Sequence, residues 1–241
     1  MKNYVVSLGV ELEGAVPNVI EGLYDDVHYG DVSSLIYNDV KEPEHLEDDE
    51  DGTVHFPPRA RFSNMLFAAP VIGEWKYWSS ELDNVKGWLS VMFTKMKYRG
   101  NRTCGFHVHI ALNSDFAYTM DSDVRVAGRF WRIFRKEYLR KYGCAGRNSR
   151  RYINRMNGTY SAFPFNSRTG LNLGSKSSAL VLTSDEYGTI EIRIFPYQKS
   201  FREACDTLDW CVNTVNKICD YITRHPSCGK LPDGEIDSLG D

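Results

Sequence analysis

Three segments of the chain alternate apolar and polar residues, which is the pattern of a β-strand with one buried face. They are residues 3–13, 104–112 and 188–196. Each strand carries two ionisable side chains on its polar face, and these pairs are Glu11 with Glu13, His107 with His109, and Glu191 with Arg193. A half-exposed strand needs polar residues on one face, but packing alone does not select carboxylates, imidazoles and a guanidinium.

Helical spacing of apolar residues predicts three helices. The first covers residues 80–100 and begins at Ser80 in the style of a capping box. The second covers residues 121–142, and the last begins with a capping box at Ser200 and ends before residue 226. These helices are long enough to cover the apolar face of a sheet.

Three further segments complete the predicted outline. Residues 178–183 and 188–196 are expected to form a hairpin. The acidic, proline-containing segment 41–51 predicts an exposed loop, and the irregular segment 144–177 is too long for a simple connection and predicts a functional loop.

The order of strands and helices predicts an α+β fold in which helices pack on the apolar face of a sheet. No linker or internal repeat divides the chain of 241 residues, so we expect one catalytic domain over residues 1–225 and a flexible tail over residues 226–241.

Composition and charge narrow the class of function. Lysine and arginine total 29 against 32 acidic residues, so the formal charge is −3, which disfavours nucleic acid or an anionic membrane as the main partner. No apolar run approaches the roughly 20 residues that a membrane span needs, and the first residues lack a signal-peptide pattern. The six cysteines form no CxxC pair. We therefore expect a soluble, cytoplasmic protein without a disulfide framework.

The three ionisable pairs suggest a metal-dependent chemistry. If their strands lie side by side, one sheet face gathers three carboxylates, two imidazoles and a guanidinium. Carboxylates that converge repel one another and need a cation, and oxygen ligands with an imidazole suit Mg²⁺ or Mn²⁺. Arg193 would then supply a fixed positive charge for a phosphoryl group in transfer, which points to ATP-dependent chemistry.

Four motifs, in chain order, resemble those of the amidoligase family, and they are Gly9–Glu13, Asp51–Val54, Cys104–His109 and Thr189–Phe195. This family consists of carboxylate–amine ligases similar in fold to glutamine synthetase and glutamate–cysteine ligase. The resemblance extends over most of the chain. It implies a curved antiparallel sheet that forms a funnel-like half-barrel, which is open to ATP at one end and to substrate at the other.

The resemblance also implies roles for individual residues. It makes four side chains the metal ligands: Glu11, Glu13, His107 and Glu191. Arg193 would contact the transferred phosphate, while Asp51 or Glu74 would accept a proton from the amine. Glu74 is also a candidate for a further metal ligand, because it stands roughly where the family has a glutamate before a Val-Ser-Pro-like stretch. Here Trp-Lys-Tyr-Trp-Ser follows it instead. His109 would contact phosphate or support the site.

Three arginines of the segment 144–177 are candidates for cofactor binding, and they are Arg147, Arg151 and Arg155. They could close over the nucleotide phosphates or the substrate carboxylate. A solvated basic loop and RNA binding with Tyr152 are the alternatives.

The function expected from the sequence is an ATP- and Mg²⁺-dependent carboxylate–amine ligase that acts through an acyl phosphate. The substrates would be a carboxylate and an amine, either small molecules or peptides. A metal-dependent phosphotransferase, or an inactive relative that binds a nucleotide or a protein, is the alternative.

Overall fold

The computed structural model of the chain describes residues 3–19, 32–49, 52, 54–57, 60–62, 65–67, 70–143, 152, 165–166, 170–171, 180–183 and 189–226. Its helices and strands in chain order are β1 (Val5–Val16), α1 (Val32–Ile36), η1 (Tyr37–Asp39), η2 (Pro43–His45), β2 (Leu46–Asp49), β3 (Ala60–Phe62), β4 (Met65–Phe67), β5 (Val71–Ser79), α2 (Leu82–Thr94), β6 (Gly105–Leu112), α3 (Ser114–Ser122), α4 (Val124–Tyr142), β7 (Phe165–Asn166), β8 (Gly170–Leu171), β9 (Leu180–Thr183), β10 (Thr189–Pro196) and α6 (Phe201–Arg224).

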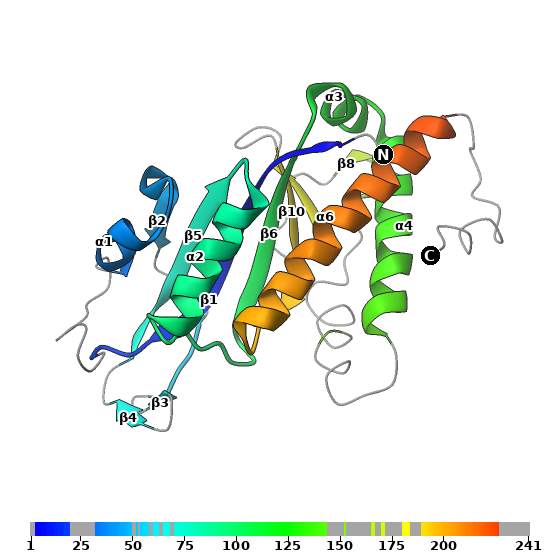
Figure 1. The fold of residues 1–241 in the computed structure, drawn as a ribbon. Helices are drawn as coiled ribbons and strands as arrows, with labels where there is room; N and C mark the ends of the chain where they lie inside the picture. Colours follow the sequence, from blue (N-terminus) through cyan, green and yellow to red (C-terminus); the bar gives the residue numbers. More distant parts are fainter. Residues whose placement is uncertain are drawn as a thin grey trace. The chain divides into compact units, whose positions relative to one another are not determined.

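The main sheet has the strand order β2-β5-β1-β6-β10-β9 and is open, because its two edges belong to different strands (Figure 1). β5 pairs antiparallel with both β1 and β2, and β10 pairs antiparallel with β9. The chain is thus a mixed α+β protein with an antiparallel sheet. The three strands predicted from alternation are confirmed as β1, β6 and β10.

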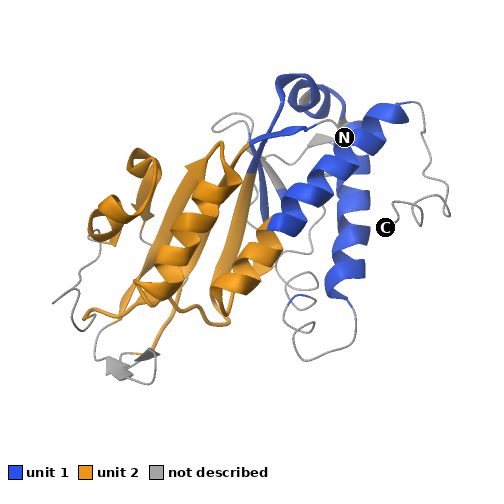
Figure 2. Cartoon of the chain, viewed as in Figure 1, with its two compact units in different colours: residues 1–6, 110–192, 209–241 blue, residues 7–109, 193–208 orange. Residues whose placement is uncertain are grey.

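The chain divides into two compact units (Figure 2). Unit 1 comprises residues 1–6, 110–192 and 209–241, and unit 2 comprises residues 7–109 and 193–208. The single domain expected over residues 1–225 stays a prediction. Only residue 226 of the predicted tail is described.

Unit 2 buries one face of its strands under α2. Val10 lies opposite Tyr77 in the β1–β5 register, and both side chains are buried. The ring of Tyr77 stacks on that of Trp88 in α2, with centroids 5.8 Å apart and planes 15° apart. Large buried aromatic side chains of this kind contribute much of a core's stability. The other face of β1 and β5 is therefore free to carry polar side chains.

The end of β1 approaches the segment after α2 very closely at Gly14. A Cβ atom at this position would lie 2.3 Å from Cε2 of Tyr98 and 2.7 Å from the carbonyl oxygen of Arg99. The Tyr98 hydroxyl donates a hydrogen bond of 2.7 Å to the carbonyl oxygen of Glu13. Gly14 thus lets the backbone come close enough to hold the Glu13 end of the strand in place.

Unit 1 contains α3, α4, β9, the first half of β10 and most of α6. The backbone N–H groups of Tyr4 and Val5 both donate to Oδ1 of Asn216 on α6. Trp210 of the same helix packs against Phe134 of α4, with ring centroids 5.5 Å apart. The predicted hairpin is confirmed, since Thr189 lies opposite Thr183 in the register.

The three predicted helices are present, with three corrections. The first helix ends at Thr94 and not at residue 100, because the chain turns at Lys97, whose φ is 55°. The first helix is capped at Glu81 without a side-chain hydrogen bond, so the predicted capping box at Ser80 is wrong. The predicted helix 121–142 is interrupted at Asp123, whose carboxylate accepts from the N–H of Arg125 and starts α4. At Ser200 the prediction is confirmed, because its hydroxyl accepts a hydrogen bond from the N–H of Glu203.

The prediction of a loop over residues 41–51 is wrong in part. Residues Leu46–Asp49 form β2, which pairs with β5 along four positions. Acidic residues are poor strand formers, but the open edge of β5 supplies hydrogen-bond partners that outweigh this preference.

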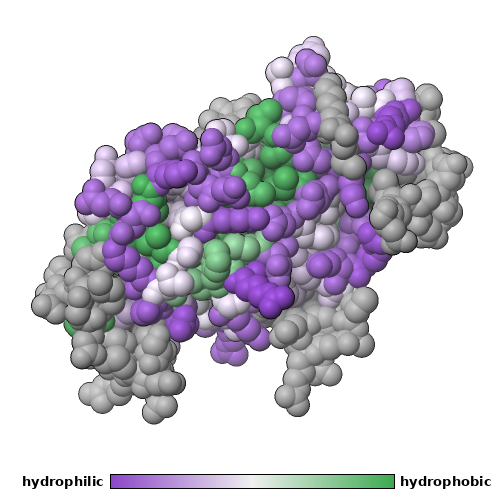
Figure 3. Space-filling view, in the orientation of Figure 1, coloured by the Kyte–Doolittle hydropathy of each residue, from purple (hydrophilic) through white to green (hydrophobic). Residues whose placement is uncertain are grey.

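The surface agrees with the charged composition. The face seen in Figure 3 is covered mostly by hydrophilic residues, with smaller hydrophobic areas among them. Among the described residues, no helix combines the length and the apolar character that crossing a membrane requires.

Candidate metal centre

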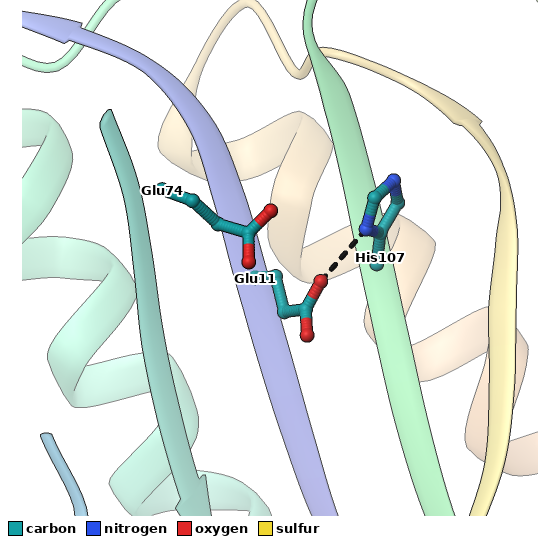
Figure 4. A group of neighbouring side chains, drawn as sticks. All are labelled: Glu11, Glu74 and His107. Atoms are coloured by element: carbon teal, nitrogen blue, oxygen red, sulfur yellow. Dashed lines mark hydrogen bonds and ion pairs between the residues drawn. The ribbon is translucent and has the colours of Figure 1, made fainter. Parts of the chain in front are cut away.

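The polar face of unit 2 brings charged side chains from neighbouring strands together. Glu11 lies opposite Lys76 and Glu13 opposite Glu74 in the β1–β5 register. On the other side of β1, the N–H of Gly105 in β6 donates to Oε2 of Glu13. Figure 4 shows the side chains of Glu11, Glu74 and His107 projecting from β1, β5 and β6.

Glu11 lies between two imidazoles. Its Oε2 atom is 2.8 Å from Nδ1 of His107, and its Oε1 atom is 2.8 Å from Nε2 of His109. Burial by itself raises the pKa of the Glu11 carboxyl, but the hydrogen bonds to both imidazoles outweigh it and hold the pKa well below its ordinary value. Glu11 therefore stays ionised at neutral pH.

His107 is completely buried and faces two carboxylates. Its Nε2 atom lies 3.2 Å from Oε1 of Glu13, while Nδ1 faces Glu11. Burial lowers the pKa of His107, but the hydrogen bond to Glu11 and the charge of Glu13 raise it above the ordinary value, against an opposing effect of Arg193. Arg193 thus acts on His107 through its positive charge.

Glu74 and Lys76 form the second half of the group. The pKa of Glu74 is raised, first by burial and then by the charge of Glu11. Nζ of Lys76 lies 2.9 Å from Oε1 of Glu74, 3.8 Å from Oε1 of Glu11 and 3.7 Å from Oδ2 of Asp49. Partial burial lowers the pKa of Lys76, but these carboxylates outweigh it and raise the pKa, so the ammonium stays charged.

The arrangement fits a divalent cation. One ligand atom each of Glu11, Glu74 and His107 lies within 4.8 Å of the other two. Ligands of one Mg²⁺ lie at most about 4.2 Å apart and those of one Ca²⁺ about 5 Å, so these three atoms could hold such an ion after a small movement of the side chains. Two carboxylates with one imidazole are the donor set that Mg²⁺ or Mn²⁺ accepts.

The structure of unit 2 brings together six of the side chains predicted from the sequence, and these are Glu11, Glu13, Glu74, His107, His109 and Arg193. Glu74, a candidate both for accepting a proton and for a further metal ligand, lies among the potential metal ligands. Glu13, predicted as a ligand, instead contacts Gly105 and His107.

The remaining predicted residues are not members of the group formed by Glu11, Glu74 and His107. Glu191 is buried in β10 within unit 1, and its role as a metal ligand stays a prediction. Four candidates lie outside the described residues, and these are Asp51, Arg147, Arg151 and Arg155.

Lys76 and Asp49 were missed by reasoning from the sequence. The alternation of residues 71–79 places Glu74 and Lys76 on one face of a strand and could have indicated Lys76. Asp49 carried no such signal, because its segment was expected to be a loop.

Of the aromatic residues beside Glu74 and Lys76 in β5, Trp75 is buried, whereas Trp78 is 37% exposed and stacks with His45.

Comparison of the chain with protein-family models gives no match, and comparison with curated proteins gives none either. The amidoligase resemblance therefore rests on the four sequence motifs. The chemistry of the site rests on the geometry of its side chains.

Proposed function

We propose that the chain is an ATP- and Mg²⁺-dependent carboxylate–amine ligase with its metal centre on the polar sheet face. The observation that carries the proposal is the group formed by Glu11, Glu74 and His107, whose ligand atoms lie within 4.8 Å of one another. The motifs shared with amidoligases and the open antiparallel sheet support it, and they favour a half-barrel similar to that of glutamine synthetase.

The energetics of the group favour a ligand. Glu11 and Glu74 are largely withdrawn from water on adjacent strands, and the charge of Glu11 raises the pKa of Glu74. Burying two carboxylates near each other costs stability that the core of the protein does not require. A bound divalent cation would offset this cost. A functional role for the cation explains why the sequence keeps these acids on the face opposite the core.

The chemistry follows from the poor reactivity of a carboxylate. Its negative charge repels an amine, and oxide is a very poor leaving group, so amide formation needs prior phosphorylation by ATP. The acyl phosphate that results reacts with the amine to give the amide, with phosphate as the leaving group, and ADP is released in the first step. Bound Mg²⁺ would supply charge neutralisation of the phosphate oxygens.

The residues of this chain take separate parts in that chemistry. Glu11, Glu74 and His107 would hold the cation, and Glu13 and His109 would orient His107 and Glu11 through the contacts described above. Arg193 would stabilise the charge on the phosphoryl group in transfer. With Glu74 among the ligands, Asp51 is the remaining predicted acceptor for the proton of the amine.

The first experiment measures nucleotide binding. Calorimetric titration with a non-hydrolysable ATP analogue is expected to show binding to the wild type with Mg²⁺ and much weaker binding with EDTA. Glu74→Gln should lose the Mg²⁺-dependent part. Glu137→Gln is the matched control, because Glu137 is a buried carboxylate of α4 that pairs with Arg140 in unit 1. Absence of Mg²⁺-dependent binding would contradict the proposal.

A second experiment distinguishes the ligase from a phosphotransferase. Hydroxylamine, offered with a pool of carboxylates and MgATP, captures acyl phosphates as hydroxamates. A ligase should form hydroxamate and ADP together, whereas a phosphotransferase acting on a hydroxyl group should release ADP without hydroxamate.

A further inference from the structure

We propose that Lys76 sets the cation affinity of the metal centre, because its ammonium is the counterion of the metal-free group and is displaced when a divalent cation enters. This inference rests on the metal centre of the proposed function. It adds a residue that none of the four sequence motifs contains.

The contacts of Lys76 overlap those expected for the metal. Its Nζ atom lies 2.9 Å from Glu74 and 3.8 Å from Glu11, which are two of the three potential metal ligands. In both cases the nearest carboxylate atom is Oε1. The ammonium therefore already neutralises the acids that would coordinate the ion.

A divalent cation and this ammonium cannot share the two carboxylates without cost. Charges of +2 and +1 about 5 Å apart repel each other enough to weaken binding about tenfold, even at the dielectric constant of water. Partial burial of the group increases this effect, because the surroundings screen the charges less well than bulk water does. The affinity for the metal therefore depends on whether the ammonium can leave.

Asp49 provides the place to which Lys76 can move. Its Oδ2 atom lies 3.7 Å from Nζ of Lys76, and its side chain is 65% exposed, whereas that of Lys76 is 24% exposed. Asp49 stands opposite Glu74 in the β2–β5 register, at the edge of the sheet, and it is not one of the three potential metal ligands in unit 2. The flexible stem of lysine lets the ammonium move toward Asp49 and water while the metal takes Glu11 and Glu74.

A purely structural role for Lys76 makes a different prediction. In that case the lysine would only link β5 to β1 and β2, and its removal would lower stability without changing the affinity for the metal. The measurement that separates the two roles is therefore the affinity of the folded variant for a metal ion alone.

The experiment is a calorimetric titration of the full chain with Mn²⁺ in the absence of nucleotide. Lys76→Met is expected to bind Mn²⁺ about tenfold more tightly than the wild type, whereas Lys76→Arg, which keeps the charge, should bind like the wild type. Lys95→Met is the matched control, because Lys95 pairs with Asp39 outside the group, and its affinity should not change. In EDTA, Lys76→Met should melt at a lower temperature than the wild type, and Mn²⁺ should raise its melting temperature by more.

The outcomes distinguish failure of this inference from failure of the proposed function. Unchanged or weaker Mn²⁺ binding in folded Lys76→Met would overturn the inference alone, provided that the wild type binds Mn²⁺ and Glu74→Gln does not. Lys76→Gln serves the same purpose if the methionine variant does not fold. Absence of Mn²⁺ binding in the wild type and in every Lys76 variant would overturn both the metal centre and the role of Lys76.

Discussion

Glu11→Gln is expected to destabilise the metal-free protein by about 3 kcal/mol near pH 6. The substitution keeps the size of the side chain but removes the charge and one acceptor from a buried carboxylate that faces His107 and His109, each at 2.8 Å. Hydrogen bonds to charged groups contribute roughly 1.5–3 kcal/mol each, so losing two would cost about 3–6 kcal/mol. We expect the lower end of this range, because the substitution also removes the repulsion between Glu11 and Glu74.

The stability lost in Glu11→Gln should depend on pH. The folded pKa of Glu11 lies below the ordinary value of 4.5, so its contribution to stability is present above pH 4.5 and is lost as the pH falls through the folded pKa. The folded pKa of His107 lies above 6.5, so its contribution is present below pH 6.5 and is lost as the pH rises through the folded pKa. The difference between wild type and variant should therefore be largest between about pH 5 and 6.5.

The assay is urea unfolding followed by circular dichroism in EDTA, at pH 6 and pH 9, for the wild type and Glu11→Gln. The wild type and Glu11→Gln should differ less in free energy of unfolding at pH 9 than at pH 6. The decrease should be roughly 1.4 kcal/mol for each unit by which the substitution lowers the pKa of His107. A difference below about 1 kcal/mol at pH 6, or one that is equal at both pH values, would refute the reasoning on the Glu11–His107 interaction.

Three further predictions concern other parts of the structure. Gly14→Ala should lower the free energy of unfolding by about 2 kcal/mol, because the new Cβ atom would lie 2.3 Å from the ring of Tyr98, and unchanged urea unfolding would contradict this close approach. Arg193→Ala should reduce ADP release far more than it weakens binding of the ATP analogue, and an equal loss of both would indicate a role in binding alone. Asp123→Ala should destabilise the protein by about 1 kcal/mol, because it removes the N-cap of α4. Asp123→Asn should lose much less stability, because asparagine is also a good N-cap residue, and urea unfolding of both variants tests this.

The sequence by itself determined which face of each strand carries the ionisable residues. In a strand successive side chains point to opposite faces, so the alternation around Glu11 and His107 could be assigned without knowing the partners of either strand. The two helices that end at residues 142 and 224 were predicted for the same reason, because helical spacing of apolar residues is also a local property. The resemblance to amidoligases added expected roles but no distances.

Only the tertiary structure decided which of these residues meet. Strand pairing between β1 and β5 joins residues 55 to 71 positions apart in the chain, and it places Glu74 and Lys76 beside Glu11. Asp49 joins them because β2 pairs with the edge of β5, although its acidic sequence predicted a loop. Such pairings depend on the packing of the whole sheet against its helices, and no local pattern encodes them. Glu11, Glu13 and Glu74 could therefore be identified from the sequence, whereas their contacts with Lys76 were decided by the fold.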